Sequence, residues 1–572
     1  MKILSYFLDG LREISPKKNI HSLLSNLKGD ILAGITVGII ALPLALAFGE
    51  ISQLGPIAGI WGAIAGGIIG GLFGGCLVGV SGPTAPKAAQ IAAYMSFFVV
   101  GTTNEPDFIA AFSIIFLSGL ILVLISLLRI SHLIHYTPYP VMAGFMCGIG
   151  ALVILTQLNA FIGLSVEKNI PDVFKNLNYS INNFHAEALY VSLPSLIILF
   201  LWPKISNTSK TLSKIPSPFI ALIIGTCIAQ FFNLDIPYIG DKMGSDMTNK
   251  VFSLYVPDFN RTLEFIGPAF ALAGLAILDS LLSCKVADNI TGKRHSSDRE
   301  TFGQGMANMA AGLFGGVTTA TATMRTVANI KFGAKTPMAS IVHGLTLLAF
   351  LLGLSSFVAA IPTACLAAIL FKVGIEILDY RILPLLKKLP IKDLLIFSVV
   401  LFVTVYQDLM IAIFIGITFA IITSSKELIN IIKTKMVHKF YQIGNSSFDL
   451  GLTIKNTEDL SIHVFVPKGP LFFGSVEPLR NDFNLIPKTE TIIIDMREVT
   501  MIDITGLFFL EDIIKSSNSN GTKVIVSNAT KAVKDTLIKL EFIKRIGNEN
   551  YYESIDNDIL EITKNYDSKL FL

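Results

Sequence analysis

One pentapeptide occurs twice in this chain, and each copy precedes a break in an apolar region of membrane-spanning length. The motif Gly-Leu-Phe-Gly-Gly stands at residues 71–75 and again at 312–316. The first copy leads to Thr84, bracketed by prolines, and the second leads through a threonine-rich run to Arg325. Lipid tolerates unpaired backbone groups only where they line a cavity inside the protein, so paired broken helices indicate a substrate site. The freed N–H groups of a short new helix favour an anion there.

The composition places most of the chain in a membrane. Of 572 residues, 52% are hydrophobic and 15% are charged, and the mean hydropathy is +0.63. Long apolar runs are followed by a segment of ordinary soluble composition, so we predict an N-terminal cytoplasmic segment, a transmembrane domain and a soluble domain at 1–29, 30–435 and 445–565. The net charge of +3 is too small to indicate a nucleic-acid partner.

Fourteen membrane segments can be placed on the sequence, two of them half-helices at 84–99 and 321–332. The other twelve are predicted at 30–50, 56–75, 107–128, 138–161, 187–203, 215–233, 263–284, 303–316, 336–356, 361–379, 391–408 and 409–431. Basic residues gather in the loops that this count assigns to the cytoplasm, which also places both termini there. The offset between the pentapeptides implies two halves of seven segments, and an odd number per half gives an inverted repeat. Chance recurrence in a glycine-rich membrane protein is the alternative.

Asp279 is the acid that the sequence places deep within a span. A carboxylate in hydrocarbon costs roughly 2.5 to 3.5 kcal/mol, so Asp279 should face a cavity and have a cation partner. Ser283 follows one turn later on the same helix face, and the two offer a carboxylate and a hydroxyl to one hard cation. A structural ion pair with Arg325 or Lys87 is the alternative.

The threonine-rich run offers ligands to both a cation and an anion. The run comprises Thr318, Thr319, Thr321 and Thr323. Its hydroxyl and carbonyl oxygens suit sodium, although the hydroxyl groups of threonines in membrane helices often bond to the backbone of their own helix. We expect the N–H groups of Ala322 and Thr323 to face an anion. Arg325 either adds positive potential to the anion site or neutralises Asp279. Lys87 is the matching cation of the first half-helix, unless it extends toward the membrane interface.

The soluble segment alternates strands and helices. Strands are predicted at 461–466, 491–495 and 523–527, and helices at 506–515 and 531–540. This pattern is typical of a small α/β domain. The sequence has no glycine-rich phosphate loop, metal cluster or nucleophile paired with a base, so we interpret the domain as regulatory or assembling and the chain as not an enzyme.

Several of these stretches resemble the SulP (sulfate permease) family of anion transporters with its cytoplasmic STAS domain. The resemblance covers about 30 to 560 and is most specific at 279–300, 303–308, 312–316, 322–329 and, in the STAS part, 492–506. The membrane motifs look most like the sodium-dependent bicarbonate transporters of cyanobacteria. The resemblance implies an elevator-type core of segments 1–4 and 8–11 moving against a gate of 5–7 and 12–14. It also implies an anion held between segments 3 and 10, a homodimer and a bacterial inner membrane.

The resemblance also assigns ligands. The implied sodium ligands are Asp279, Ser283, Thr321 and Thr323, and the implied anion contacts are Thr84, Ala85, Ala322 and Thr323, with Arg325 as a further candidate. Ser283 stands where the family pattern has threonine, and Thr321 stands at a small-residue position. The segment 81–87 lacks the acid that bicarbonate-type members have before the proline and adds Lys87. These departures leave an anion transporter but weaken bicarbonate as its substrate.

In the STAS part, residues 503–506 match the phosphorylatable Asp-Ser-Ser-Gly motif at three of four places, with Thr505 at the modified serine. Thr505 is therefore a candidate regulatory phosphosite, or an ordinary helix N-cap, and a regulatory protein is a candidate partner of the STAS domain. The function expected for the whole chain is sodium-coupled bicarbonate uptake, with sodium as coupling ion and no other cofactor. A proton-coupled sulfate or dicarboxylate symporter, an uncoupled anion channel and a membrane-tethered signalling scaffold are the alternatives.

Overall fold

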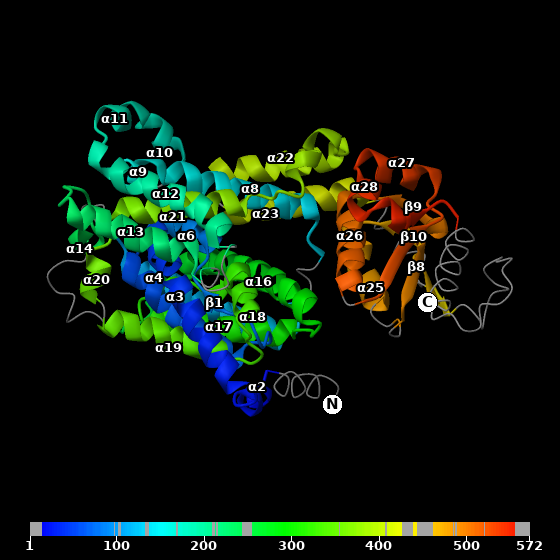
Figure 1. The fold of residues 1–572 in the computed structure, drawn as a ribbon, viewed down its shortest axis with the longest axis horizontal. Helices are drawn as coiled ribbons and strands as arrows, with labels where there is room; N and C mark the ends of the chain where they lie inside the picture. The colour runs from blue at the N-terminus through cyan, green and yellow to red at the C-terminus, as the bar shows by residue number, and fades with distance from the viewer. Residues whose placement is uncertain are drawn as a thin grey trace. The chain divides into compact units, whose positions relative to one another are not determined.

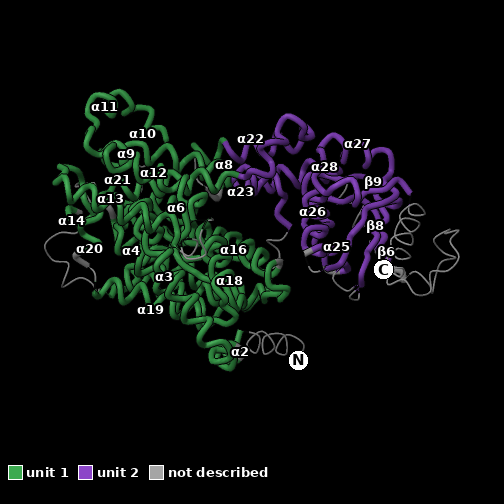
Figure 2. Tube along the Cα trace, viewed as in Figure 1, with its two compact units in different colours: residues 1–134, 146–378, 402–411 green, residues 135–145, 379–401, 412–572 purple. Residues whose placement is uncertain are grey.

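The computed structural model describes residues 14–554 except for 96–97, 101–104, 132–135, 167–169, 207, 209–211, 213–214, 243–253, 354, 407–408, 426–438, 443–461, 484–485, 487–488 and 520. The chain forms two compact units, coloured separately in Figure 2. Unit 1 comprises residues 1–134, 146–378 and 402–411, and unit 2 comprises 135–145, 379–401 and 412–572. The predicted domain boundaries at 435, 445 and 565 lie outside the described residues, as do residues 1–13 of the N-terminal segment.

Each of the fourteen predicted segments contains a helix, but not every one of these helices is long and apolar (Figure 1). Those of the first half are α3 (Leu27–Ile51), α4 (Pro56–Ala65) continued by the π-helical η1 (Gly66–Gly70) and α5 (Gly71–Phe73), α6 (Ala85–Met95), α7 (Phe108–Leu127), α8 (Tyr139–Thr156), α12 (Ala186–Ser206) and α13 (Ser217–Phe231). Those of the second half are α16 (Thr262–Thr291), α17 (Ser297–Leu313), α18 (Thr323–Lys331), α19 (Met338–Gly353), α21 (Thr363–Ile377), α22 (Ile391–Tyr406) and α23 (Leu409–Thr423). By length and composition, six helices of the described chain can cross a membrane, and three apolar ones are shorter. The chain is thus multi-pass, while the count of fourteen crossings stays a prediction.

The start of α17 differs from its prediction. The sequence placed this segment at 303–316, but the helix begins at Ser297. The polar residues at its start resemble a loop, yet Ser296 is the N-cap residue, and Asp298 and Glu300 lie in the first turn, where acids complement the helix dipole. The earlier start brings Glu300 into the helix.

Helices of unit 1 pack closely through small residues. In this unit α3 contacts α19 and α4, α7 contacts α17 and α16, and α12 contacts α13 and α21. A Cβ atom added at Gly119 of α7 would lie 2.5 Å from the backbone nitrogen of Met309 in α17. Such close backbone approach is the usual basis of helix association in membranes, where burial of apolar side chains gives little driving force.

Unit 2 contains a five-stranded sheet of order β11-β10-β8-β6-β5. Its strands are β5 (Lys439–Gln442), β6 (Ile462–Val466), β8 (Thr491–Asp495), β10 (Lys523–Ser527) and β11 (Tyr551–Tyr552). The pairings are parallel except for β5, which is antiparallel to β6. Both β6 and β8 are buried along their whole length, as expected for parallel strands covered on both faces.

Four helices accompany this sheet, together with a parallel pair of strands, β7 (Gly469–Leu471) and β9 (Val499–Ile502). The helices are α25 (Phe473–Phe483), α26 (Ile504–Ser519), α27 (Lys531–Lys539) and α28 (Phe542–Ile546). The predicted strands and helices of the α/β domain are confirmed, whereas the further strands β5, β7, β9 and β11 and the helices α25 and α28 were not predicted. Other short elements of the described chain include α2 (Lys17–Ser22), β2 (Val99–Val100), β3 (Glu105–Pro106), α9 (Leu158–Phe161), α10 (Ile170–Lys175), α11 (Leu177–Asn182), α14 (Ile239–Lys242) and α20 (Ser355–Ala359).

Candidate functional site

The two broken helices meet in a short antiparallel ribbon inside unit 1. Strand β1 (Ser81–Gly82) pairs with β4 (Ala320–Thr321), with Ser81 opposite Thr321 and Gly82 opposite Ala320. Half-helix α6 begins at Ala85 and α18 begins at Thr323, so both start directly after the ribbon. Each pentapeptide stands where the preceding helix, α5 or α17, ends. The repeated motif therefore marks two breaks that come together although more than half of unit 1 separates them in sequence.

Four of the residues predicted to bind ions lie together beside this ribbon. The Ser283 hydroxyl donates to the carbonyl oxygen of Asp279 over 2.9 Å and lies 2.7 Å from the hydroxyl oxygen of Thr323. Thr84 lies close enough to Asp279 for the two side chains to interact, but their geometry falls outside that of a regular hydrogen bond. Within the described chain, neither Thr84 Oγ1 nor Asp279 Oδ2 has a hydrogen-bond partner with acceptable geometry, although both atoms are buried. Buried oxygen atoms are nearly always paired, and a hard cation is one ligand that would pair with these two.

Two other predicted ligands, Thr321 and Ala322, form hydrogen bonds with other parts of unit 1. The Thr321 hydroxyl contacts the carboxylate of Glu300 and accepts a hydrogen bond from Gln304 Nε2 at 2.9 Å, so this hydroxyl group is already paired. The backbone N–H of Ala322 donates to the Val80 carbonyl oxygen at 3.0 Å. The expectation that this particular N–H faces an anion is therefore wrong. The donor completes the hydrogen bonding of the ribbon instead.

Lys87 and Arg325 each reach from one half-helix to the break of the other half. The Lys87 ammonium donates to the carbonyl oxygen of Thr319, and Arg325 Nη2 donates to that of Pro83 at 3.1 Å. Both side chains are almost completely buried. Neither forms an ion pair with Asp279 in the described structure, but both charges act on its carboxyl group. These two cations place positive charge beside the starts of both half-helices, where it would attract an anion.

Arg325 is held very close to the ribbon. A Cβ atom added at Gly82 would lie 2.0 Å from Arg325 Nη1, so only glycine leaves room for the guanidinium in this position. Nη1 itself is buried and has no hydrogen-bond partner among the described residues. An anion could therefore receive a hydrogen bond from it.

Access to the site differs between its two halves. Thr84 and Ala85 are buried, and Asp279 is half-buried. At the start of α18, in contrast, Thr323 and Met324 are exposed. The site is therefore open on the side of α18, where the hydroxyl pair of Ser283 and Thr323 lies.

A polar network on α17 joins the two breaks, and the sequence reasoning did not assign it to the site. Glu300 Oε2 accepts the backbone N–H groups of Gly75 and Cys76, both at 2.9 Å. Gln304 Nε2 donates to the Ser81 hydroxyl at 2.6 Å and to Glu300 Oε1 at 2.9 Å. Glu300 is 2% exposed, so Asp279 is not the only acid deep within a helix of unit 1.

Asn308 continues this network by one further helical turn. Its Oδ1 accepts the Thr318 hydroxyl at 2.6 Å and the Thr319 N–H at 2.8 Å, and its Nδ2 donates to the Thr319 carbonyl oxygen at 2.9 Å. Residues four apart share one helix face, so the polar spacing 300, 304, 308 was a signal available in the sequence. The placement of the helix start at 303 obscured it.

In unit 2, Thr505 lies in the first turn of α26. Asp503 Oδ1 accepts the Gly506 N–H at 2.7 Å, so Asp503 caps the helix, and the interpretation of Thr505 as the N-cap is wrong. The Thr505 hydroxyl instead accepts the backbone N–H of Tyr139 at 3.1 Å. Burial raises the pKa of Asp503 well above its usual value, and the nearby carboxylate of Asp393 raises it further.

Comparison with known proteins gives matches over nearly the whole chain. The model of the sulfate permease family matches residues 27–400, and that of the STAS domain matches residues 453–557. The bicarbonate transporter BicA of Picosynechococcus sp. is 31% identical over 531 residues, which cover 91% of this chain and 92% of that protein. The putative sulfate transporter YvdB of Bacillus subtilis is 28% identical over 541 residues, which cover 93% and 97%.

Two solved structures share the fold. The transmembrane domain of a cyanobacterial bicarbonate transporter, BicA, matches with a TM-score of 0.60 at 32% identity, covering 69% of this chain and 98% of that domain. The murine anion transporter Slc26a9 in its inward-facing state matches with a TM-score of 0.61, covering 98% of this chain and 94% of that protein. At 18% identity, the second match shows the fold alone.

Proposed function

Because this chain belongs to the sulfate permease family of anion transporters, we propose that it is a secondary active transporter in which sodium drives anion uptake. The proposed substrate is a small oxyanion, with bicarbonate ahead of sulfate or a dicarboxylate. One observation carries this proposal. Asp279 Oδ2 and Thr84 Oγ1 are buried oxygen atoms without hydrogen-bond partners in the described residues, beside the start of both half-helices.

Sodium would be held by oxygen atoms of α16, β4 and the start of α18. The proposed ligands are Asp279, Ser283, Thr323 and Thr321, the last through its backbone, because its hydroxyl is bonded to Glu300 and Gln304. Thr84 is a further candidate. Carboxylate, hydroxyl and carbonyl oxygens are the ligands preferred by hard cations.

The anion would lie between the starts of α6 and α18. Thr84, Ala85 and Thr323 stand at these starts, where backbone N–H groups attract negative charge. We propose that Ala322 contributes only through the ribbon and not through its N–H. Arg325 would supply a hydrogen-bond donor through Nη1, and Lys87 would add positive potential.

The coupling follows from the cost of moving charge through a region of low dielectric constant. An anion that enters alone changes the net charge of the site, and an unpaired buried charge is expensive. Sodium and a monovalent anion together leave the net charge unchanged. The doubly loaded core, built on α3–α7 and α16–α19, would therefore move against the helices α12, α13 and α21 at lower cost than the half-loaded core.

Bicarbonate is placed first because of the identity to a bicarbonate transporter over most of both chains. Sulfate remains an alternative, since a putative sulfate transporter matches over a similar length. We propose further that the protein is a homodimer of the bacterial inner membrane with cytoplasmic termini. Phosphorylation at Thr505 would remove its contact with Tyr139 and so give a regulatory protein a means of control.

A second candidate is anion transport without a coupling cation. Lys87 is a buried cation bound to the Thr319 carbonyl oxygen, and it stands where the bicarbonate-type pattern is not followed. A fixed ammonium at this point could replace the charge that sodium supplies. In that case uptake would follow the anion gradient alone.

Uptake into proteoliposomes separates these candidates. Labelled bicarbonate, sulfate and succinate would be supplied with and without an inward sodium gradient at fixed pH. We expect sodium-dependent bicarbonate uptake that Asp279→Asn abolishes without unfolding the protein. The matched control is Glu264→Gln, which changes an exposed acid in the first turn of the same helix, with its side chain 56% exposed.

Retained uptake with normal sodium dependence in Asp279→Asn would refute the sodium site. Uptake that is independent of sodium in the wild type and lost in Lys87→Ala would favour the second candidate. Uptake driven by a proton gradient instead would make Asp279 a proton carrier.

A further inference from the structure

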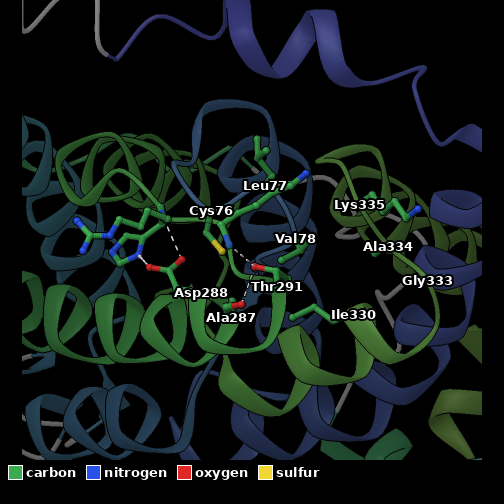
Figure 3. Close-up of a pocket in the computed structure, with 13 residues that line it drawn as sticks. Cys76, Leu77, Val78, Ala287, Asp288, Thr291, Ile330, Gly333, Ala334 and Lys335 are labelled. Carbon is green, nitrogen blue, oxygen red and sulfur yellow. Dashed lines mark hydrogen bonds and ion pairs between the residues drawn. The ribbon is translucent and has the colours of Figure 1, made fainter. Parts of the chain in front are cut away.

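Unit 1 contains a cavity of about 440 Å³ that shares no lining residue with the ion site (Figure 3). Its walls come from the segment 76–78 before β1, the C-terminal end of α16 with the loop that follows, and the end of α18 with residues 333–335. Pockets of about 300–1,000 Å³ hold small organic ligands. The cavity is therefore larger than a single inorganic ion requires.

The inner wall of the cavity is apolar. Val78, Ala287 and Ile330 line this wall; Val78 and Ala287 are buried, and Ile330 is half-buried. In Figure 3 these three side chains lie below Leu77 and opposite Ala334. An apolar body, such as a flat ring, is the ligand part that this wall would accept.

The rim of the cavity carries three cations without acidic partners. Lys293, Arg294 and Lys335 are exposed, and none forms an ion pair in the described part of the chain. The one acid of the lining, Asp288, is already engaged: its Oδ2 lies 2.7 Å from His295 Nδ1, and its Oδ1 accepts the His295 N–H at 2.9 Å. Uncompensated positive charge around a cavity attracts anions and concentrates them there.

We propose that this cavity binds a phosphate monoester, with the phosphate at the cationic rim and an apolar body against the inner wall. The basic loops that form the rim are assigned to the cytoplasm by the distribution of Lys and Arg, so the ligand would come from that side. Free nucleotides and the head group of phosphatidic acid both present this chemistry. The proposal does not depend on which anion the protein transports.

Binding here would act on both halves of the ion site. The segment 76–78 leads directly into β1, and the wall on the other side is the end of α18. A ligand that holds these two segments together would stabilise one arrangement of the half-helices over another. The ligand would shift the equilibrium between the two arrangements by its difference in binding free energy for them, and uptake would change with that shift.

The first test is equilibrium binding of AMP to the purified full-length protein in detergent. Adenosine and inorganic phosphate are the comparison probes, because each carries only half of the proposed chemistry. We expect saturable binding of AMP and at least tenfold weaker binding of both comparison probes. The double variant Lys293→Gln/Arg294→Gln should bind AMP about tenfold or more weakly, which corresponds to the loss of one or more charge-assisted hydrogen bonds.

Lys331→Gln is the matched control. Lys331 is an exposed cation at the end of α18 and does not line the cavity, so this variant should bind AMP like the wild type. Without ligand, every variant should unfold at the temperature of the wild type. Lys335→Gln is a second rim variant that should meet this condition, because the hydrogen bond from Lys335 to Asp30 uses the backbone N–H and not the side chain.

Nanodiscs distinguish the two sources of the ligand. If phosphatidic acid occupies the cavity, AMP binding should weaken in nanodiscs that contain it, and phosphatidic acid should co-purify less with the double variant. Absence of binding by both AMP and phosphatidic acid would overturn the proposal. Equal loss in Lys331→Gln, or equal binding of inorganic phosphate and AMP, would overturn it as well.

Discussion

Replacement of Glu300 by alanine should destabilise the transporter strongly, because this carboxylate joins both helix breaks. Oε2 accepts two backbone N–H groups, and Oε1 contacts Gln304 and Thr321, at a side chain that is 2% exposed. Alanine leaves the N–H groups of Gly75 and Cys76 buried without this acceptor. Each such group costs about 1–3 kcal/mol, so we expect a loss of about 2–6 kcal/mol in the free energy of unfolding.

Glutamine at position 300 provides the graded comparison. Its amide keeps one acceptor oxygen for the two N–H groups but loses the negative charge. Hydrogen bonds to charged groups contribute about 1.5–3 kcal/mol and neutral ones about 0.5–1.5 kcal/mol. Glu300→Gln should therefore lose less stability than Glu300→Ala. Uptake should fall in the same order, since Thr321 and the segment before β1 lose a common anchor.

The assay is thermal unfolding of the full chain in detergent, followed by uptake into proteoliposomes. Glu264→Ala serves as the control, because its exposed ion pair with Arg261 should contribute only about 0–1 kcal/mol. The reasoning fails if Glu300→Ala unfolds at the temperature of Glu264→Ala. It also fails if glutamine destabilises the protein as much as alanine does.

Three further changes test other parts of the structure. Gly82→Ala should reduce uptake severalfold while the protein still folds, because its Cβ displaces the guanidinium that lies 2.0 Å away; Gly267→Ala, with nothing within 4 Å, should leave uptake unchanged. Asp503→Asn should unfold at a higher temperature than the wild type, and the difference should grow as the pH rises above about 4. The pKa of Asp503 is raised in the folded state, so ionisation of the wild-type carboxyl group destabilises that state. A difference in unfolding temperature that stays constant across pH would contradict this. Arg381→Lys should speed amide hydrogen exchange in α26. The guanidinium of Arg381 lies 4.3 Å from the ring centroid of Phe508, and lysine loses this stacking, which contributes about 0.5–2 kcal/mol. Unchanged exchange would argue against the contact.

The sequence alone located most of the helical segments along the chain and the positions of the two breaks. Apolar runs of membrane length locate the spans because hydropathy is a property of each segment by itself. The repeated pentapeptide marked both breaks, and Asp279 stood out as an acid inside an apolar run. Strand and helix periodicity likewise located the main elements of the α/β domain.

Local signals were insufficient where polar residues begin a helix. The start of α17 looked like a loop because Ser, Asp, Arg and Glu follow one another there. In the structure these residues form the first turn, and Glu300 is buried by contacts with Gly75 and Cys76, which stand 225 and 224 residues earlier in the chain. No window of sequence around residue 300 contains those partners.

Only the tertiary structure decided which donor pairs with which acceptor. It turned the Thr321 hydroxyl toward Glu300, gave the Ala322 N–H to Val80, and brought Lys87 to Thr319, 232 residues away. It also left Asp279 Oδ2 without a partner in the described residues, which is the observation behind the ion site. Burial in a membrane follows from the composition of one segment, whereas a hydrogen bond requires two groups whose approach depends on how distant segments pack.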